Sequence, residues 1–196
     1  MPDSGQGAEL LKTAFIKYVS SLAICWLLGF SGARADSEPW VETSDAGGGA
    51  LRIRAHILID APATAVWSIL VACEKAPKVI PHLEACVMHE RDPAGRWDVR
   101  EHVINPPLLP RLRTIVRNDF NSPKRLDFKL LRGDMRRSDG AWILEPAGRG
   151  IKLSYEAIVQ TAFPVPQFIV SRSIHSDFPE MLRNVRKFSL EKAASR

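Results

Sequence analysis

The chain has 196 residues, and its 27 Lys and Arg residues outnumber its 22 Asp and Glu residues to give a formal net charge of +5. This length is enough for one domain with a substantial hydrophobic core. The basic residues are scattered along the chain without interleaved aromatic residues, which argues against nucleic acid as a partner. Solvated outer strand faces account for the modest positive charge, and a transient contact with anionic membrane lipids is the functional alternative, a better one than nucleic acid.

Residues 1–35 have the three-part layout of a secretory signal peptide. Lysines precede an apolar core at residues 18–30, which is shorter than the roughly 20 residues that a membrane-spanning helix needs. Small residues then lead to Ala35, and we expect cleavage between Ala35 and Asp36. The sequence therefore predicts a periplasmic or secreted protein, with an uncleaved N-terminal anchor as the alternative.

Only Cys73 and Cys86 remain once that segment is removed. An even pair of cysteines in an oxidising compartment favours a disulfide, which the chain-entropy model credits with about 3 kcal/mol for a loop of this length. Two buried free thiols are the alternative. No cluster of histidines and carboxylates has metal-ligand spacing, so we expect neither a metal ion nor another cofactor.

The regular elements begin after residues 36–49, a polar, glycine-rich stretch that is typical of a flexible leader. Residues 50–60 alternate apolar and polar side chains, as a strand with one buried face does. Pro62 suits the first turn of a helix, so a helix is predicted over residues 61–73. Prolines limit the following segment to a short helical turn.

Strands and turns make up most of the remaining chain. Segments separated by Asn, Asp, Gly and Pro predict strands at residues 83–92, 95–104, 111–120 and 124–133. Two longer strands, at residues 140–147 and 151–162, are joined by a hairpin turn at glycines. From Val165 onward, apolar residues recur at helical spacing. The prediction is therefore seven strands, largely an antiparallel meander, and one long terminal helix.

This order of elements and three local runs resemble the START and Bet v 1-like superfamily, and within it the polyketide cyclase/dehydrase and coenzyme Q-binding START-like group. The runs APATAVWSIL, GDMRRSDGAWILEPAGRGIKLSY and FPVP occupy residues 61–70, 133–155 and 163–166. The resemblance covers residues 50–192 and leaves 193–196 as a tail. It implies an α+β helix-grip fold, in which a seven-stranded curved antiparallel sheet wraps around a long C-terminal helix and short helices separate the first two strands. Members range from lipid carriers and quinone-binding proteins to cyclases, dehydratases and toxins, so the fold alone does not decide the function.

A sheet wrapped around one helix tends to leave a hollow that holds apolar molecules. Aromatic side chains are the expected lining, with ordinary core packing as the alternative role; the candidates are Trp97, Phe128, Trp142, Tyr155, Phe168 and Phe178. Leu108 and Leu109 lie between prolines in a connection that is typical of a gate or a membrane-docking tip. The alternative is that both leucines fold back over the core.

Catalysis would require an acid or a base inside the hollow, and His175 and Glu101 are the candidates. The other ionisable groups weighed for that role are His102, Glu156 and Asp177. The sequence favours a monomeric, non-enzymatic carrier or sensor that binds a hydrophobic small molecule such as a lipid, isoprenoid or quinone. A cyclase or dehydratase of a hydrophobic substrate and an accessory module for protein interaction are the alternatives.

Overall fold

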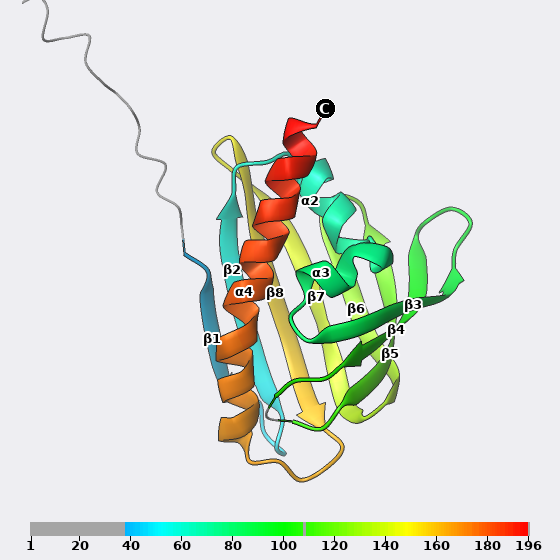
Figure 1. Ribbon diagram of the computed structural model, residues 1–196, viewed down its shortest axis with the longest axis vertical. Helices are drawn as coiled ribbons and strands as arrows, with labels where there is room; N and C mark the ends of the chain where they lie inside the picture. Colours follow the sequence, from blue (N-terminus) through cyan, green and yellow to red (C-terminus); the bar gives the residue numbers. More distant parts are fainter. Residues whose placement is uncertain (1–37, 108, 196) are drawn as a thin grey trace, which may run out of the picture. The chain divides into compact units, whose positions relative to one another are not determined.

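A curved antiparallel sheet forms most of the structure, a computed structural model that describes residues 38–107 and 109–195 (Figure 1). Across those residues the sheet has eight strands in the order β1-β2-β8-β7-β6-β5-β4-β3. The strands are β1 (Trp40–Asp45), β2 (Leu51–Ile59), β3 (Leu83–Arg91), β4 (Trp97–Ile104), β5 (Leu112–Asn121), β6 (Arg125–Gly133), β7 (Met135–Ala147) and β8 (Gly150–Thr161). From β3 to β8 each strand pairs with the next one along the chain, so this part of the sheet is the predicted meander.

Helices lie on one face of the sheet (Figure 1). The connection from β2 to β3 contains α2 (Ala63–Leu70), the 3-10 helix η1 (Cys73–Lys75) and α3 (Ala76–Val79), and α4 (Gln167–Ala194) follows β8. Helix α4 packs against β1, β2, α2 and α3. This arrangement confirms the helix-grip fold, with the short helices after the first long strand. No helix in the described ranges is both long enough and apolar enough to cross a membrane.

Strand β1 was not predicted, and the prediction of seven strands is therefore wrong by one. Its residues lie in the segment read as a leader, because β1 is an edge strand with mostly exposed side chains and shows little apolar alternation. Trp40 stacks on His56 of β2 with ring centroids 4.9 Å apart, and the Thr43 hydroxyl lies 2.7 Å from that of Ser171 on α4. Three glycines with positive φ, at residues 47–49, reverse the chain between β1 and β2.

A disulfide joins Cys73 of η1 to Cys86 of β3, as predicted, with the two Cα atoms 5.4 Å apart. The cysteines are 13 positions apart in the sequence, so the bond closes a short loop that contains α3. The chain-entropy model assigns about 3 kcal/mol to a loop of this size. The bond therefore fixes the short helices against the edge strand of the sheet.

Alternation along β4 and β5 decides which side chains face the helices. On β4, Arg100, His102 and Ile104 point toward the helices, and their partners on β5 are Val116, Thr114 and Leu112. The intervening residues of β4 point to the outer face of the sheet. This register places polar residues on the concave side of the sheet.

Candidate functional site: a cavity between sheet and helices

A cavity of about 310 Å³ lies between the concave face of the sheet and helices α2, α3 and α4. Most of its lining is apolar. Helix α4 contributes one stripe of residues at helical spacing, namely Val170, Ile174, Phe178, Met181 and Val185. The volume is at the lower end of the range for small-molecule sites.

Four aromatic rings form a cluster in the cavity wall around Tyr155 of β8. Its ring centroid lies 4.6 Å from that of Trp142 on β7, 5.7 Å from that of Phe128 on β6 and 5.0 Å from that of Phe178 on α4. Burial raises the pKa of the Tyr155 hydroxyl, which therefore stays protonated. The cluster offers flat apolar surfaces together with one neutral hydroxyl.

A buried polar network occupies the β4–β5 side of the site. Asp98 is completely buried, and its carboxylate accepts hydrogen bonds from the Arg100 guanidinium and, at 2.6 Å, from Asn118 Nδ2. Arg100 Nη2 also donates to the carbonyl oxygen of Val71, at the end of α2, over 3.4 Å. Arg100 and Asn118 line the cavity, and Asp98 balances the arginine charge. This end of the cavity is polar and close to electrically neutral.

The imidazole of His102 also lines the cavity, two positions along β4 from Arg100. Its Nε2 atom is buried and has no hydrogen-bond partner among the described residues. Burial lowers the pKa of His102 to about 4, and the charge of Arg100 contributes in the same direction. The ring is therefore neutral at pH 7. Thr114 faces it directly from β5 and lines the cavity too.

The structure brings Phe128, Trp142, Tyr155 and Phe178 together in the cavity wall. The other two aromatic candidates lie elsewhere. Trp97 is on the outer face of β4, where the Arg117 guanidinium covers its ring at 4.4 Å from the centroid. Phe168 is 70% exposed at the start of α4, because it lies off the helix stripe that faces the sheet.

Neither catalytic candidate lies in the cavity. Glu101 faces the outer side of β4, where its carboxylate accepts hydrogen bonds from Arg113 and lies 2.8 Å from His89 Nε2. These hydrogen bonds, first that from Arg113 and then that with His89, lower the pKa of Glu101 to about 2. His175 is exposed on α4, with Nε2 3.2 Å from the hydroxyl of Thr43. Both side chains stabilise surfaces of the fold instead.

The proposed gate falls in the connection between β4 and β5. Leu108 lies outside the described residues. Leu109 is half-buried, and its backbone N–H donates to the carbonyl oxygen of Pro106 over 3.4 Å. The role of this connection as a gate or a membrane-docking tip stays a prediction.

Arg100 and Asn118 were missed by the sequence reasoning, and His102 was noted only as an ionisable group. The signal was the spacing of Asp98, Arg100 and His102, which places three polar residues on one face of a strand. The opposite face carries Trp97 and two valines together with Glu101, and is the more apolar of the two. Ordinary amphipathic reasoning buries the apolar face, but this strand turns its polar face toward the cavity.

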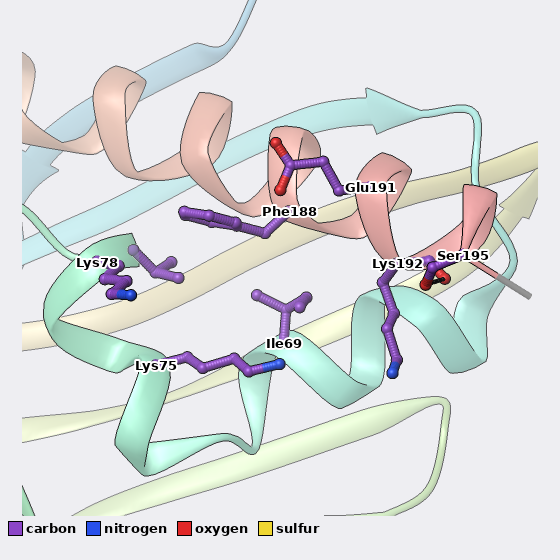
Figure 2. Close-up of a pocket in the computed structure, with 8 residues that line it drawn as sticks. Ile69, Lys75, Lys78, Phe188, Glu191, Lys192 and Ser195 are labelled. Carbon is purple, nitrogen blue, oxygen red and sulfur yellow. Dashed lines mark hydrogen bonds between the residues drawn. The ribbon is translucent and has the colours of Figure 1, made fainter.

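A second hollow, of about 290 Å³, lies on the surface between η1, α3 and the C-terminal end of α4. In Figure 2 the side chains of Lys75 and Lys192 extend toward it from different helices, with Ile69 between them. Lys78 also lines this outer pocket. Ile69 and Val79 line both hollows, so their side chains form part of the wall between the outer pocket and the cavity.

A protein-family model matches this chain. The model of the family described as polyketide cyclase / dehydrase and lipid transport matches residues 59–186. The matched range runs from the end of β2 into α4 and includes the β4–β5 polar network, although not the N-terminal strand. A search of curated proteins found no match.

Several solved structures share the fold at low sequence identity. A START superfamily protein from Mycobacterium smegmatis has a TM-score of 0.63 at 16% identity, covering 71% of this chain and 97% of that one. The Zhui aromatase/cyclase from Streptomyces has a TM-score of 0.63 at 12% identity, with 73% and 95% covered. A STAR-related lipid transfer protein from Xanthomonas axonopodis has a TM-score of 0.61 at 12% identity, with 76% and 98% covered. At these identities the likeness shows the fold alone.

Proposed function

Because this chain belongs to the polyketide cyclase / dehydrase and lipid transport family, we propose that it binds a hydrophobic small molecule in the cavity as a non-enzymatic carrier or sensor. The observation that carries the proposal is the cavity itself, an apolar chamber of about 310 Å³ with a polar network at one side. Such a chamber buries the body of an apolar ligand and orients it through a few polar groups. A lipid, an isoprenoid and a quinone all fit this description.

Binding without chemistry is the better supported role because the ionisable groups of the cavity are poor catalysts. His102, with a pKa of about 4, is a weak base near pH 7. The Arg100 guanidinium is held by Asp98 and has no proton to exchange. A cyclase-type reaction is the second candidate function. Two observations favour it: Arg100 and His102 line the cavity, and the fold of this chain also occurs in an aromatase/cyclase.

The export of the protein is part of the proposal. The signal-peptide layout of residues 1–35 supports it, and so does the Cys73–Cys86 disulfide, since such bonds persist in oxidising compartments. The carrier then works as a monomer outside the cytoplasm. Intact mass analysis of the protein purified from its native compartment should give a chain that begins at Asp36; a chain that retains residues 1–35 would contradict cleavage.

The same purification tests the ligand. Extraction and mass spectrometry should recover a near-stoichiometric apolar compound from protein isolated under non-denaturing conditions. An enzyme would instead release its product, and it would convert the recovered compound when that compound is added back and incubated with the protein. Protein that is isolated empty and also fails to bind a panel of apolar probes would contradict the carrier role.

Filling the cavity should weaken ligand binding. Val116 lies on the cavity wall, so Val116→Trp places an indole where the ligand would lie, and we expect affinity for the neutral fluorescent probe N-phenyl-naphthylamine to fall at least tenfold. The matched control is Val87→Trp, since Val87 is 47% exposed on β3. Fluorescence titration measures both affinities. Equal binding by the two variants would place the probe outside the cavity.

Transient membrane contact through the outer pocket is a further part of the proposal. Lys75, Lys78 and Lys192 line this pocket and outnumber its one acidic lining residue, Glu191. Lysines near an anionic membrane surface each contribute about 1 kcal/mol. Because the outer pocket shares a wall with the cavity, ligand exchange at the membrane takes place there in this proposal. We expect Lys75→Glu with Lys78→Glu to weaken co-sedimentation with phosphatidylglycerol vesicles several-fold.

The charge-matched control for that experiment is Lys124→Glu with Lys129→Glu, which changes two exposed lysines in the β5–β6 turn and on β6. High salt should abolish the difference between the two double variants, because salt screens exposed charges. Equal loss of vesicle binding in both would mean that net charge, and not the outer pocket, drives the contact.

A further inference from the structure

The unpaired nitrogen of His102 is a specific feature of this cavity. Nε2 is buried without a hydrogen-bond partner among residues 38–107 and 109–195, while the side-chain groups of Asp98, Arg100 and Asn118 bond to one another. Buried polar atoms are nearly always paired, since an unpaired one loses its bonds to water and gains nothing in return. Because His102 lines the cavity, its unpaired nitrogen indicates a missing partner.

The surroundings of His102 restrict what that partner can be. Thr114 is paired with it across β4 and β5 and lines the same cavity, and its side chain carries a hydroxyl. Arg100 lines the same part of the cavity, where its guanidinium donates to Asp98 and to the carbonyl oxygen of Val71. Because Asp98 balances Arg100 and the imidazole is neutral, this side of the cavity carries no net charge.

From this geometry we infer that the ligand carries an uncharged hydroxyl group, which binds between His102 Nε2 and the hydroxyl of Thr114. The inference rests on the proposed function and names the chemical class of its ligand: an apolar body that ends in an alcohol or a phenol. The aromatic cluster around Tyr155 packs against the body while the β4–β5 residues hold the hydroxyl.

A hydroxyl fits this position better than the other common polar ends. A hydroxyl both donates and accepts hydrogen bonds, so it can pair with Nε2 of a neutral imidazole whether that nitrogen accepts or donates. A carboxylate would bring an uncompensated charge into a buried site, where it is strongly disfavoured unless the histidine takes up a proton. A pure hydrocarbon would leave Nε2 unpaired.

Three probes of nearly the same shape separate these cases: naphthalene, naphthol and naphthoate. Calorimetric titration at pH 7 of the protein lacking residues 1–35 should show naphthol binding about tenfold more tightly than naphthalene, the effect of one good hydrogen bond. Naphthoate should bind most weakly. In His102→Leu the preference for naphthol over naphthalene should vanish while naphthalene still binds, which also shows that the variant is folded.

Two further variants sharpen the test. His102→Gln keeps a hydrogen-bonding side chain and should retain part of the preference. His175→Leu removes an exposed histidine outside the cavity and should leave the preference for naphthol over naphthalene unchanged. Equal affinities for naphthol and naphthalene in the unaltered protein would overturn the inference, as would a preference that survives in His102→Leu. Failure of naphthalene itself to bind, by contrast, would count against the apolar cavity as a binding site and so against the proposed function.

Discussion

Replacing Asp98 with alanine is expected to destabilise the folded protein by about 3–5 kcal/mol, the usual cost of removing one partner of a buried ion pair. Asp98 is fully buried, and its loss leaves the Arg100 guanidinium, itself only 4% exposed, without a counter-charge. Asn118 Nδ2 loses its acceptor in the same step. Urea unfolding followed by circular dichroism measures the change in the free energy of unfolding.

The chain offers a matched control with the same spacing. Arg125 and Asp127 also lie two positions apart on one strand and form an ion pair at 2.7 Å, but both side chains are about half exposed. Asp127→Ala should therefore cost less than about 1 kcal/mol. A double variant, Asp98→Leu with Arg100→Met, removes both charges and should recover most of the stability lost in Asp98→Ala. A loss in Asp98→Ala no larger than in Asp127→Ala would show that the buried pair does not stabilise the fold.

Asp98 and Trp97 are neighbours on β4 and point to opposite faces of the sheet. The sequence predicts the strand but not which of these two faces turns inward. The period of two along residues 95–104 correctly predicted strand β4, since alternation depends only on the backbone. Which face turns inward depends on what lies opposite, and here the polar face lines a cavity. The rule that apolar faces are buried therefore assigned Trp97 to the wrong side of the sheet.

Helix α4 was predicted from the sequence, whereas strand β1 was not. The apolar spacing that includes Ile174, Phe178 and Val185 predicted the helix and the stripe that reaches the cavity, because a helix against a sheet has a strong 3.6-residue signal. Strand β1 gives no such signal, since an edge strand needs few buried side chains. Its position depends on hydrogen bonds to β2 and on the contacts of Thr43 with α4, which sequence periodicity does not encode.

Acid should destabilise the protein through His102 at a higher pH than through the carboxylates of Glu101 and Asp92. The pKa of His102 is near 6.5 in an unfolded chain and about 4 in the folded protein, so the unfolded state binds more protons between these values. The contribution of neutral His102 to the stability of the folded state is therefore complete above about pH 6.5 and is lost as the pH falls toward 4. The shift corresponds to a loss of about 3 kcal/mol in the free energy of unfolding. Glu101 and Asp92, with pKa values of about 2, lose their contributions only at lower pH.

His102→Leu isolates this effect because it removes the titrating group from the cavity wall. The free energy of unfolding of the variant should change much less between pH 6.5 and 4.5 than that of the unaltered protein. A residual slope is expected from His56, whose pKa is lowered by burial and by the charge of Lys152. Proton NMR of the His102 ring should show a midpoint near pH 4 in the folded state. A midpoint near 6.5 would mean that water reaches the imidazole freely, and the unpaired nitrogen would then need no ligand to complete it.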